Sequence, residues 1–439
     1  TMEALENAGL EVNTTLYENS EVFYPSGHFS WTPAYADEEI RNWLFSNVKA
    51  GGGADTEGVA ELTALDVIDV TTKNIFDENT FRRATTDYDV TVQSDIYGVL
   101  LKVTGEEGTT IKVTADTDTY TYGNFGNKAL DYEAGTEIKY DDDLDGYLVK
   151  LDQSYGGYDS EFVQTVSVEV SKNGEETTTY TVQITREDDT WIYDEFTQET
   201  YTTTDGAFEL DYNVYYPDGY ETSGKKYPVV FALHGNGQSD FGPDDPLRQP
   251  IDMILKRYQM ATVWAKDSEM DTSKECIVVA PQVDKLASEY WGLGNNLETC
   301  GLAAYELLEN EFLNKEYVDT DRIYVTGLSL GGMGTYSMLV NHPDTFAGAI
   351  AVCGMVTDDY DYSALEPMSG RIYITHAEGD QSVDFENFEK ITDGLRNAGI
   401  EFESKTWTAN EVFYPQPHFS WTPTYADEDI RAWLFNQSK

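Results

Sequence analysis

A serine lies in the pattern Gly327-Leu-Ser329-Leu-Gly331, after a short apolar run at 323–326 and before a helical pattern at 334–339. A serine hydroxyl is a weak nucleophile at neutral pH and needs a base held beside it. A G-x-S-x-G sequence between a strand and a helix forms a sharp turn that lifts the serine above the edge of a sheet. Without that strand and helix it would be only a glycine-rich turn. In this setting the pattern predicts that Ser329 is a nucleophile for acyl transfer.

The base beside such a serine is usually histidine, and the chain contains five. His28 belongs to a duplicated N-terminal segment, and His342 follows the helix after the nucleophile. His376 ends a predicted strand directly before an acidic loop, and His234 is expected to shape a tight turn. His418 follows the last predicted strand, which fits the chain order Ser…Asp…His of α/β-hydrolases. His418 is therefore the predicted base.

The acid that orients the base is expected in the loop at 376–384, after the penultimate core strand. This loop offers Glu378, Asp380 and Asp384. Asp380 follows a glycine at the bend and is the predicted partner of His418. Asp384 is better placed to cap the helix that follows.

Acyl transfer also needs backbone N–H groups that bind the oxyanion. The N–H of Leu330, directly after the nucleophile, is the first predicted donor. The second is expected from Asn236 or Gly237, in the turn after the buried strand 227–233. The alternative for this second stretch is a plain tight turn.

Four stretches together resemble a known family: Leu233-His-Gly, the run 321–335, His376-Ala-Glu-Gly-Asp380, and His418-Phe-Ser-Trp. They are similar to the α/β-hydrolase serine esterases of the "predicted peptidase" group, a relative of polyhydroxybutyrate depolymerases and feruloyl esterases. The resemblance covers about 190–439. Some members of this group carry an N-terminal immunoglobulin-like domain.

The resemblance implies a site with defined parts. Ser329, Asp380 and His418 would form a catalytic triad, and Leu330 with the 236–237 turn would form the oxyanion hole. Trp291 would be an aromatic wall of the substrate pocket, which His234 would also line. No metal ion or organic cofactor is implied.

An internal repeat marks the N-terminus. Residues 5–45 and 395–435 match without gaps at a constant offset of 390 positions, so His28 corresponds to His418. We interpret residues 1–46 as the tail of a preceding hydrolase copy in a tandem array. A tail without its own sheet cannot bury its apolar side chains alone. We expect it to pack on the β-sandwich described next, to swap onto a neighbouring chain, or to stay loose.

The middle of the chain differs in pattern from its C-terminal part. Residues 47–63 are Gly-rich and predict a linker. Residues 64–186 contain short alternating runs between Gly, Asn and Asp turns, which predict an antiparallel β-sandwich. It resembles the immunoglobulin-like or cadherin-like modules of bacterial extracellular enzymes, chiefly through the strands on either side of an Asn173-Gly174 turn. Residues 187–439 alternate strands with helices, which predicts an α/β-hydrolase fold with a mostly parallel sheet.

One acidic loop in the β-rich part could suggest calcium. Residues 141–152 begin with a D-x-D-x-D-G pattern, as a calcium loop does. The glutamate expected at the twelfth place is absent, and the flanks look like strands. A solvated acidic turn is the favoured interpretation.

Composition limits the class of protein. The 439 residues suggest two or three domains, and 40% apolar residues exclude global disorder. A net charge of −52 disfavours nucleic acid, anionic membranes and polyanionic substrates. No apolar run is long enough to span a bilayer. Cys276, Cys300 and Cys353 are expected to be buried free thiols rather than to include a Cys276–Cys300 bridge.

These patterns favour an extracellular, secreted bacterial carboxylesterase. Acetyl or feruloyl esters on plant cell-wall polysaccharide are the expected substrates, by resemblance and modular layout. Two alternatives remain open. One is a serine peptidase with the same triad, and the other is a non-catalytic surface-binding or adhesion protein on a hydrolase fold.

Overall fold

The computed structural model describes most of the chain beyond residue 57. The described residues are 58–69, 74–76, 81–83, 85–92, 98–117, 135–142, 144–151, 162–186, 191–240, 251–256, 258–284, 290–408, 412 and 417–439. The chain divides into two units, Thr1–Val59 and Ala60–Lys439. The predicted tail at 1–46 and most of the predicted linker lie outside the described residues.

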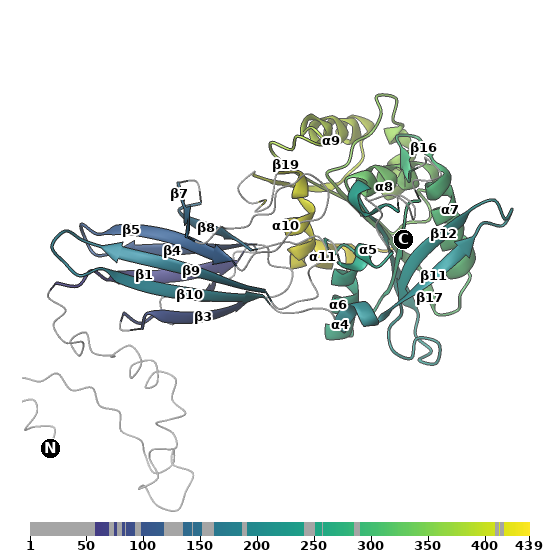
Figure 1. Ribbon diagram of the computed structural model, residues 1–439. Helices are drawn as coiled ribbons and strands as arrows, with labels where there is room; N and C mark the ends of the chain where they lie inside the picture. Colours follow the sequence, from purple (N-terminus) through teal and green to yellow (C-terminus); the bar gives the residue numbers. More distant parts are fainter. Residues whose placement is uncertain are drawn as a thin grey trace, which may run out of the picture. The chain divides into compact units, whose positions relative to one another are not determined.

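An eight-stranded sheet organises the C-terminal part (Figure 1). Its order is β11-β12-β14-β13-β17-β18-β19-β20. β11 and β12 pair antiparallel, as do β12 and β14, and every later pair is parallel. The strands are β11 Phe196–Thr202, β12 Glu209–Tyr215, β13 Tyr227–Leu233, β14 Ile277–Pro281, β17 Val318–Leu328, β18 Gly348–Val352, β19 Ile372–Ala377 and β20 Glu403–Trp407.

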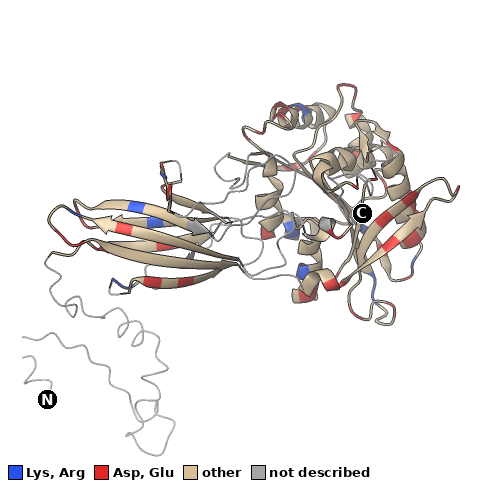
Figure 2. Cartoon of the chain, in the orientation of Figure 1, with Lys and Arg blue, Asp and Glu red and all other residues tan. Residues whose placement is uncertain are grey.

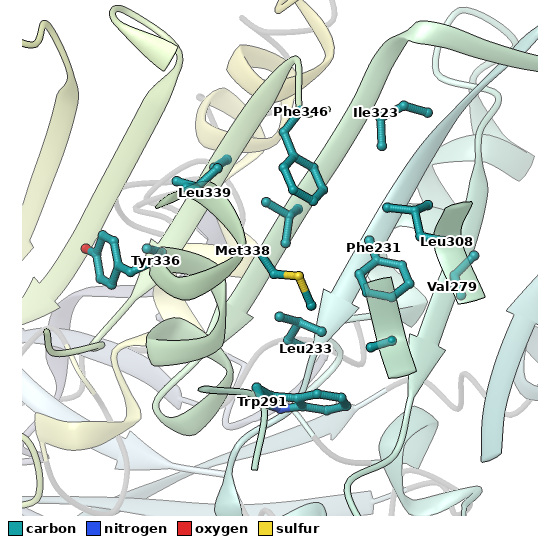
Figure 3. Packing of buried hydrophobic residues seen from close by; sticks show 14 of the residues in the cluster. Phe231, Leu233, Val279, Trp291, Leu308, Ile323, Tyr336, Met338, Leu339 and Phe346 are labelled. Carbon is teal, nitrogen blue, oxygen red and sulfur yellow. The ribbon is translucent and has the colours of Figure 1, made fainter. Parts of the chain in front are cut away.

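Helices cover both faces of this sheet. One apolar cluster joins the strands to α7, α8 and α9, and a second joins them to α4, α5, α6, α10 and α11. Figure 3 shows Phe231, Leu233 and Met338 gathered in the first cluster. The helices are α4 Trp191–Asp194, α5 Met253–Lys256, α6 Thr262–Met270, α7 Thr299–Leu307, α8 Leu330–Asn341, α9 Glu386–Ala398, α10 Trp421–Ala426 and α11 Glu428–Phe435.

The sequence explains why β13 lies at the centre. All seven of its residues are buried, which is typical of a parallel strand covered on both faces. Phe231 and Leu233 face the first apolar cluster, whereas Val230 and Ala232 face the second. Side chains alternate along a strand, so a continuous apolar run serves both cores. The predicted α/β-hydrolase fold is confirmed for this part.

The segment before it is all β. Two five-stranded sheets, ordered β2-β1-β4-β8-β7 and β3-β10-β9-β5-β6, enclose one apolar core. The Asn173-Gly174 turn joins β9 to β10 as predicted, with Gly174 at φ 87°. One expectation was wrong: β3 pairs with β10 in parallel, so the sheets are not purely antiparallel. The strands are β1 Leu62–Asp69, β2 Asn74–Phe76, β3 Asp87–Val92, β4 Gly98–Gly105, β5 Thr110–Thr117, β6 Thr136–Ile138, β7 Tyr140–Asp141, β8 Gly146–Lys150, β9 Phe162–Ser171 and β10 Thr178–Arg186.

The structure also bears on the predictions made from composition, which concern the cysteines, the acidic residues and membrane spans. The three cysteines are buried free thiols, as predicted. Acidic residues are spread over both the all-β part and the α/β part (Figure 2). None of the described helices is long and apolar enough to cross a lipid bilayer.

Candidate active site

Ser329 occupies the sharp turn between β17 and α8. Its backbone has φ 53° and ψ −113°, a strained conformation for a residue with a side chain. The turn closes only because its neighbours are small. A Cβ on Gly327 would lie 2.2 Å from the carbonyl oxygen of Gly331, and one on Gly331 would lie 1.8 Å from that of Leu233. The two motif glycines therefore allow strand, turn and helix to pack in contact.

His418 brings its imidazole to this serine from a separate segment. It lies on the short 3-10 helix Pro417–Phe419. Its Nε2 is 3.0 Å from Ser329 Oγ, and its Nδ1 is 2.8 Å from Asp380 Oδ2. His418 and Asp380 are buried, whereas Ser329 is partly exposed. The three residues thus form one hydrogen-bonded path from the acid to the hydroxyl.

The surroundings of Asp380 keep its carboxylate ionised. Oδ1 accepts the backbone N–H groups of Ser382 and Val383, at 2.8 and 3.0 Å. Burial alone would raise the pKa of Asp380, but hydrogen bonds from His376, His418 and the Val383 N–H outweigh it. The pKa therefore lies well below its usual range. An ionised carboxylate accepts the Nδ1–H of His418, which leaves Nε2 free to accept the serine proton.

Two backbone segments border the serine where an oxyanion could be bound. Leu330 is the first residue of α8, and the first N–H groups of a helix have no intrahelical acceptor. On the other side, a Cβ on Gly235 would lie 3.6 Å from Ser329 Cβ. The short 3-10 helix Asn236–Gln238 begins directly after this glycine. Leu330 and Gly235 therefore flank the nucleophile, and the predicted 236–237 turn directly follows Gly235.

His234 and Trp291 do not fit their predicted place in a pocket wall. Both are fully buried, so neither presents a surface to substrate. The indole Nε1–H of Trp291 donates to the carbonyl oxygen of His234 at 3.0 Å. His234 Nε2 in turn accepts the backbone N–H of Val283 at 2.9 Å. The two side chains brace the turn beside Ser329 from below, and Figure 3 shows Trp291 next to Leu233 inside the core.

The remaining histidines lie in other settings. His342 follows α8, and its ring stacks on Tyr305 with centroids 3.3 Å apart. Burial lowers the pKa of His342. His28 lies outside the described residues. His376 also belongs to the site, although its sequence pattern predicted no role for it: its Nε2 lies 3.1 Å from Asp380 Oδ2. The signal in the sequence that could have found this contact is the spacing of four residues between His376 and Asp380.

Within the described ranges, one group of potential metal ligands meets closely: Cys353, Asp380 and His418, whose ligand atoms lie within 4.8 Å of one another. Asp380 and His418 already bond to each other. Burial raises the pKa of the Cys353 thiol. In the acidic loop of the all-β part, Asp145 accepts hydrogen bonds from Tyr140 and Lys102. These contacts agree with the predicted solvated acidic turn; Asp143 and Asp152 lie outside the described residues.

The fold is that of the α/β-hydrolases, and within it a serine, a histidine and an aspartate are joined by hydrogen bonds. Residues 307–367, which include the serine turn, match the prolyl oligopeptidase family. No curated protein sequence matches the chain.

The chain is similar to several solved structures. A thermostable esterase superposes with a TM-score of 0.51 at 21% identity, covering 81% of this chain and 100% of that chain. S-formylglutathione hydrolase FrmB from Staphylococcus aureus gives a TM-score of 0.39 at 15% identity, covering 55% and 96%. The feruloyl esterase module from Clostridium thermocellum gives 0.39 at 16% identity, covering 55% and 88%. The likeness to the thermostable esterase agrees with the α/β-hydrolase fold.

Proposed function

We propose that the chain is a serine hydrolase that cleaves carboxylic esters through an acyl-enzyme. One observation carries the proposal: the hydrogen-bonded path from Asp380 through His418 to the hydroxyl of Ser329. Ser329 Oγ attacks the ester carbonyl while His418 Nε2 takes its proton. His418 then gives this proton to the leaving alcohol. Water, activated by the same imidazole, hydrolyses the acyl-enzyme.

Asp380 holds the Nδ1–H of His418 and stabilises the imidazolium that forms during each proton transfer. The negative charge on the attacked carbonyl oxygen is bound by the N–H of Leu330 and by a second N–H from Asn236 or Gly237. These donors are fixed before the reaction, so they stabilise the transition state without reorganising. The fully buried Trp291 and His234 support this turn.

For the substrate we propose an acetyl or hydroxycinnamoyl ester on plant cell-wall polysaccharide. The support is the sequence resemblance to feruloyl-esterase-like enzymes and the net charge of −52, which favours neutral over polyanionic substrates. The all-β segment would be an immunoglobulin-like module of an extracellular, secreted enzyme. The N-terminal tail would exchange between chains.

A second candidate is peptide-bond hydrolysis by the same three residues. The match of 307–367 to the prolyl oligopeptidase family favours it. A triad alone does not separate amides from esters, because the pocket that selects the substrate is set by loops around it. Turnover of p-nitrophenyl acetate, methyl ferulate and acetylated xylan, compared with that of a peptide p-nitroanilide, separates the two candidates.

The central test is Ser329→Ala. We expect ester hydrolysis to fall by at least about a hundredfold, with the fold intact by circular dichroism. Ser337→Ala is the matched control, since Ser337 lies on α8 but bonds to the carbonyl oxygen of Gly294. A fluorophosphonate probe should label Ser329 in the wild-type chain. A smaller loss, or labelling at another residue, would exclude Ser329 as the nucleophile.

A further inference from the structure

Two histidines share one carboxylate oxygen at the site. Asp380 Oδ2 lies 2.8 Å from His418 Nδ1 and 3.1 Å from His376 Nε2. The other oxygen, Oδ1, is held by two backbone N–H groups of the same loop. A Ser-His-Asp path needs only one of these imidazoles. The imidazole of His376 is therefore an additional contact on Asp380 Oδ2, the oxygen that bonds to His418.

The geometry fixes which nitrogen of His376 carries a proton. His376 Nε2 lies 2.9 Å from the carbonyl oxygen of Val383 as well as 3.1 Å from Asp380 Oδ2. A carbonyl oxygen only accepts, and an ionised carboxylate only accepts. Nε2 must therefore bear the hydrogen, which it shares between the two oxygens. His376 is a donor to Asp380 in either charge state of its ring.

His376 is also held firmly. It lies on β19, opposite Thr406 of β20, and only 1% of its surface is exposed. The rings of Phe385 and Phe388 pack edge-on against it, with centroids 5.8 and 6.4 Å away. A side chain fixed in this way cannot leave Asp380 without disturbing the strand end.

Among the described residues, few charged groups lie around this cluster. Asp380, His418 and Cys353 form its buried titratable core. Glu378 and Asp384 are exposed carboxylates of the same loop. On the neighbouring strand β20, Lys405 pairs with Asp427 at 2.7 Å and lies over the ring of Trp407. From the α9 side, the groups that face His376 are the two phenylalanine rings.

We propose that His376 is a positioning residue, which acts through Asp380 and touches no substrate. Its Nε2–H fixes the carboxylate in the orientation that meets His418 and withdraws negative charge from Oδ2. It thereby sets the pH range over which His418 works as a base. This role rests on the proposed function. The pKa of Asp380 agrees with it, because hydrogen bonding by His376 is among the causes that lower this pKa despite burial.

The test compares His376→Leu, which removes the donor, with His376→Gln, whose amide nitrogen reaches about the same place. In the leucine variant the carboxylate loses a donor and becomes more basic, so it holds a proton on His418 more tightly. We expect the acid limb of the pH profile of kcat/KM to move up by about half a pH unit. The maximum should fall about tenfold. The glutamine variant should stay within about twofold of wild type in both respects.

Phe388→Leu is the matched control, because it removes packing against His376 but no hydrogen bond. It should lower Tm and leave the acid limb in place. An unmoved limb in His376→Leu, or equal damage in the glutamine and leucine variants, would overturn the proposal. Should the leucine variant fail to fold, His376→Asn replaces it, since its shorter side chain does not reach Oδ2.

A spectroscopic measurement separates this proposal from the proposed function. The chain has five histidines, so ¹⁵N-histidine NMR spectra can be assigned by single substitutions. We expect His376 as the Nε2–H tautomer, and a higher titration midpoint for His418 in His376→Leu. An Nδ1–H tautomer would overturn the positioning role. Neither NMR measurement needs catalytic turnover. A chain that is inactive on every ester would therefore refute the proposed function and leave the positioning role of His376 to be decided by NMR.

Discussion

The segments 417–435 and 27–45 carry nearly the same residues, yet the structure gives only the first a described place. In that place the C-terminal copy packs against one face of the sheet and supplies His418, whose Nε2 lies 3.0 Å from Ser329 Oγ. Phe419, Trp421 and Tyr425 fill the second apolar cluster together with residues of β17 and β18. Under the proposed function, the histidine therefore becomes a base through the site that receives the segment. The segment's own sequence does not decide this.

The two copies differ at four positions within this stretch. They are Pro417 against Gly27, Thr424 against Ala34, Asp429 against Glu39, and Ala432 against Asn42. Of the four C-terminal residues, only Thr424 is buried. The N-terminal copy thus offers a matched control for almost any substitution in the C-terminal one.

The largest contrast should appear at the histidines. We expect His418→Ala to lower kcat/KM by at least about a thousandfold, because no base then accepts the proton of Ser329. The equivalent change, His28→Ala, should leave activity unchanged. The C-terminal copy closes a shorter loop than the N-terminal copy would, because Asp380 is only 38 positions from His418. Its docking therefore costs less conformational entropy. Both variants are assayed on p-nitrophenyl acetate at low protein concentration. Loss of activity in the His28 variant alone would reverse the assignment.

Much of this site could be predicted from sequence because its signals are local or ordered along the chain. The serine turn can be recognised from Gly327 and Gly331 on either side of the serine, together with a strand pattern before them and a helix pattern after them. The continuous apolar run at 227–233 predicted a fully buried strand, and the structure has β13 there with all seven residues buried. His418 followed from elimination among five histidines, and the structure brings it within hydrogen-bonding distance of Ser329.

The errors have a common cause, which is tertiary packing that no local pattern encodes. The helical pattern at 425–435 predicts one helix, but the structure has two here, α10 and α11, because Asp427 leaves the helical conformation and caps the second. Trp291 looked like a pocket aromatic, but the chain after it folds beneath α8 and buries it. The contact of His376 with Asp380 depends on a bend at Gly379, which has φ 77°. The parallel pairing of β3 with β10 joins segments far apart in the sequence.

A smaller contrast is expected at the buried ion pair of the C-terminal copy. Arg431 donates from Nε and Nη2 to the carboxylate of Asp267, at 2.8 and 3.2 Å, and both side chains are largely buried. Arg431→Ala would leave the Asp267 carboxylate buried with Lys274 as a weak partner at 3.9 Å. We expect a loss of about 3 kcal/mol in the free energy of unfolding, measured by urea denaturation.

The control for this ion pair is Arg41→Ala, at the equivalent place in the N-terminal copy. It should change the free energy of unfolding by less than about 0.5 kcal/mol. Equal losses in the two variants would mean that both copies are docked with similar strength. In that case the C-terminal copy would have no privileged place on the sheet.

The smallest and most specific contrast concerns the one buried difference. Thr424 Oγ1 accepts the indole N–H of Trp407 at 3.1 Å and hydrogen-bonds to Thr375 at 2.9 Å. Alanine, the residue of the N-terminal copy, would leave a buried indole N–H and a buried hydroxyl without this partner. Thr424→Ala should therefore lower the free energy of unfolding by about 1–2 kcal/mol. A loss below about 0.5 kcal/mol would show that this hydrogen-bond network does not distinguish the copies.

The reverse change completes the comparison. Ala34→Thr gives the N-terminal copy the hydroxyl that the receiving site bonds, so it should strengthen any exchange of copies. The sensitive background is His418→Ala, in which only His28 can restore a base. There, Ala34→Thr should raise the residual hydrolysis of p-nitrophenyl acetate severalfold. The gain should grow with protein concentration if the copies exchange between chains, since a swapped segment binds as a second molecule. A gain that is independent of concentration would place the exchange within one chain, and the absence of any gain would confine the site to the C-terminal copy.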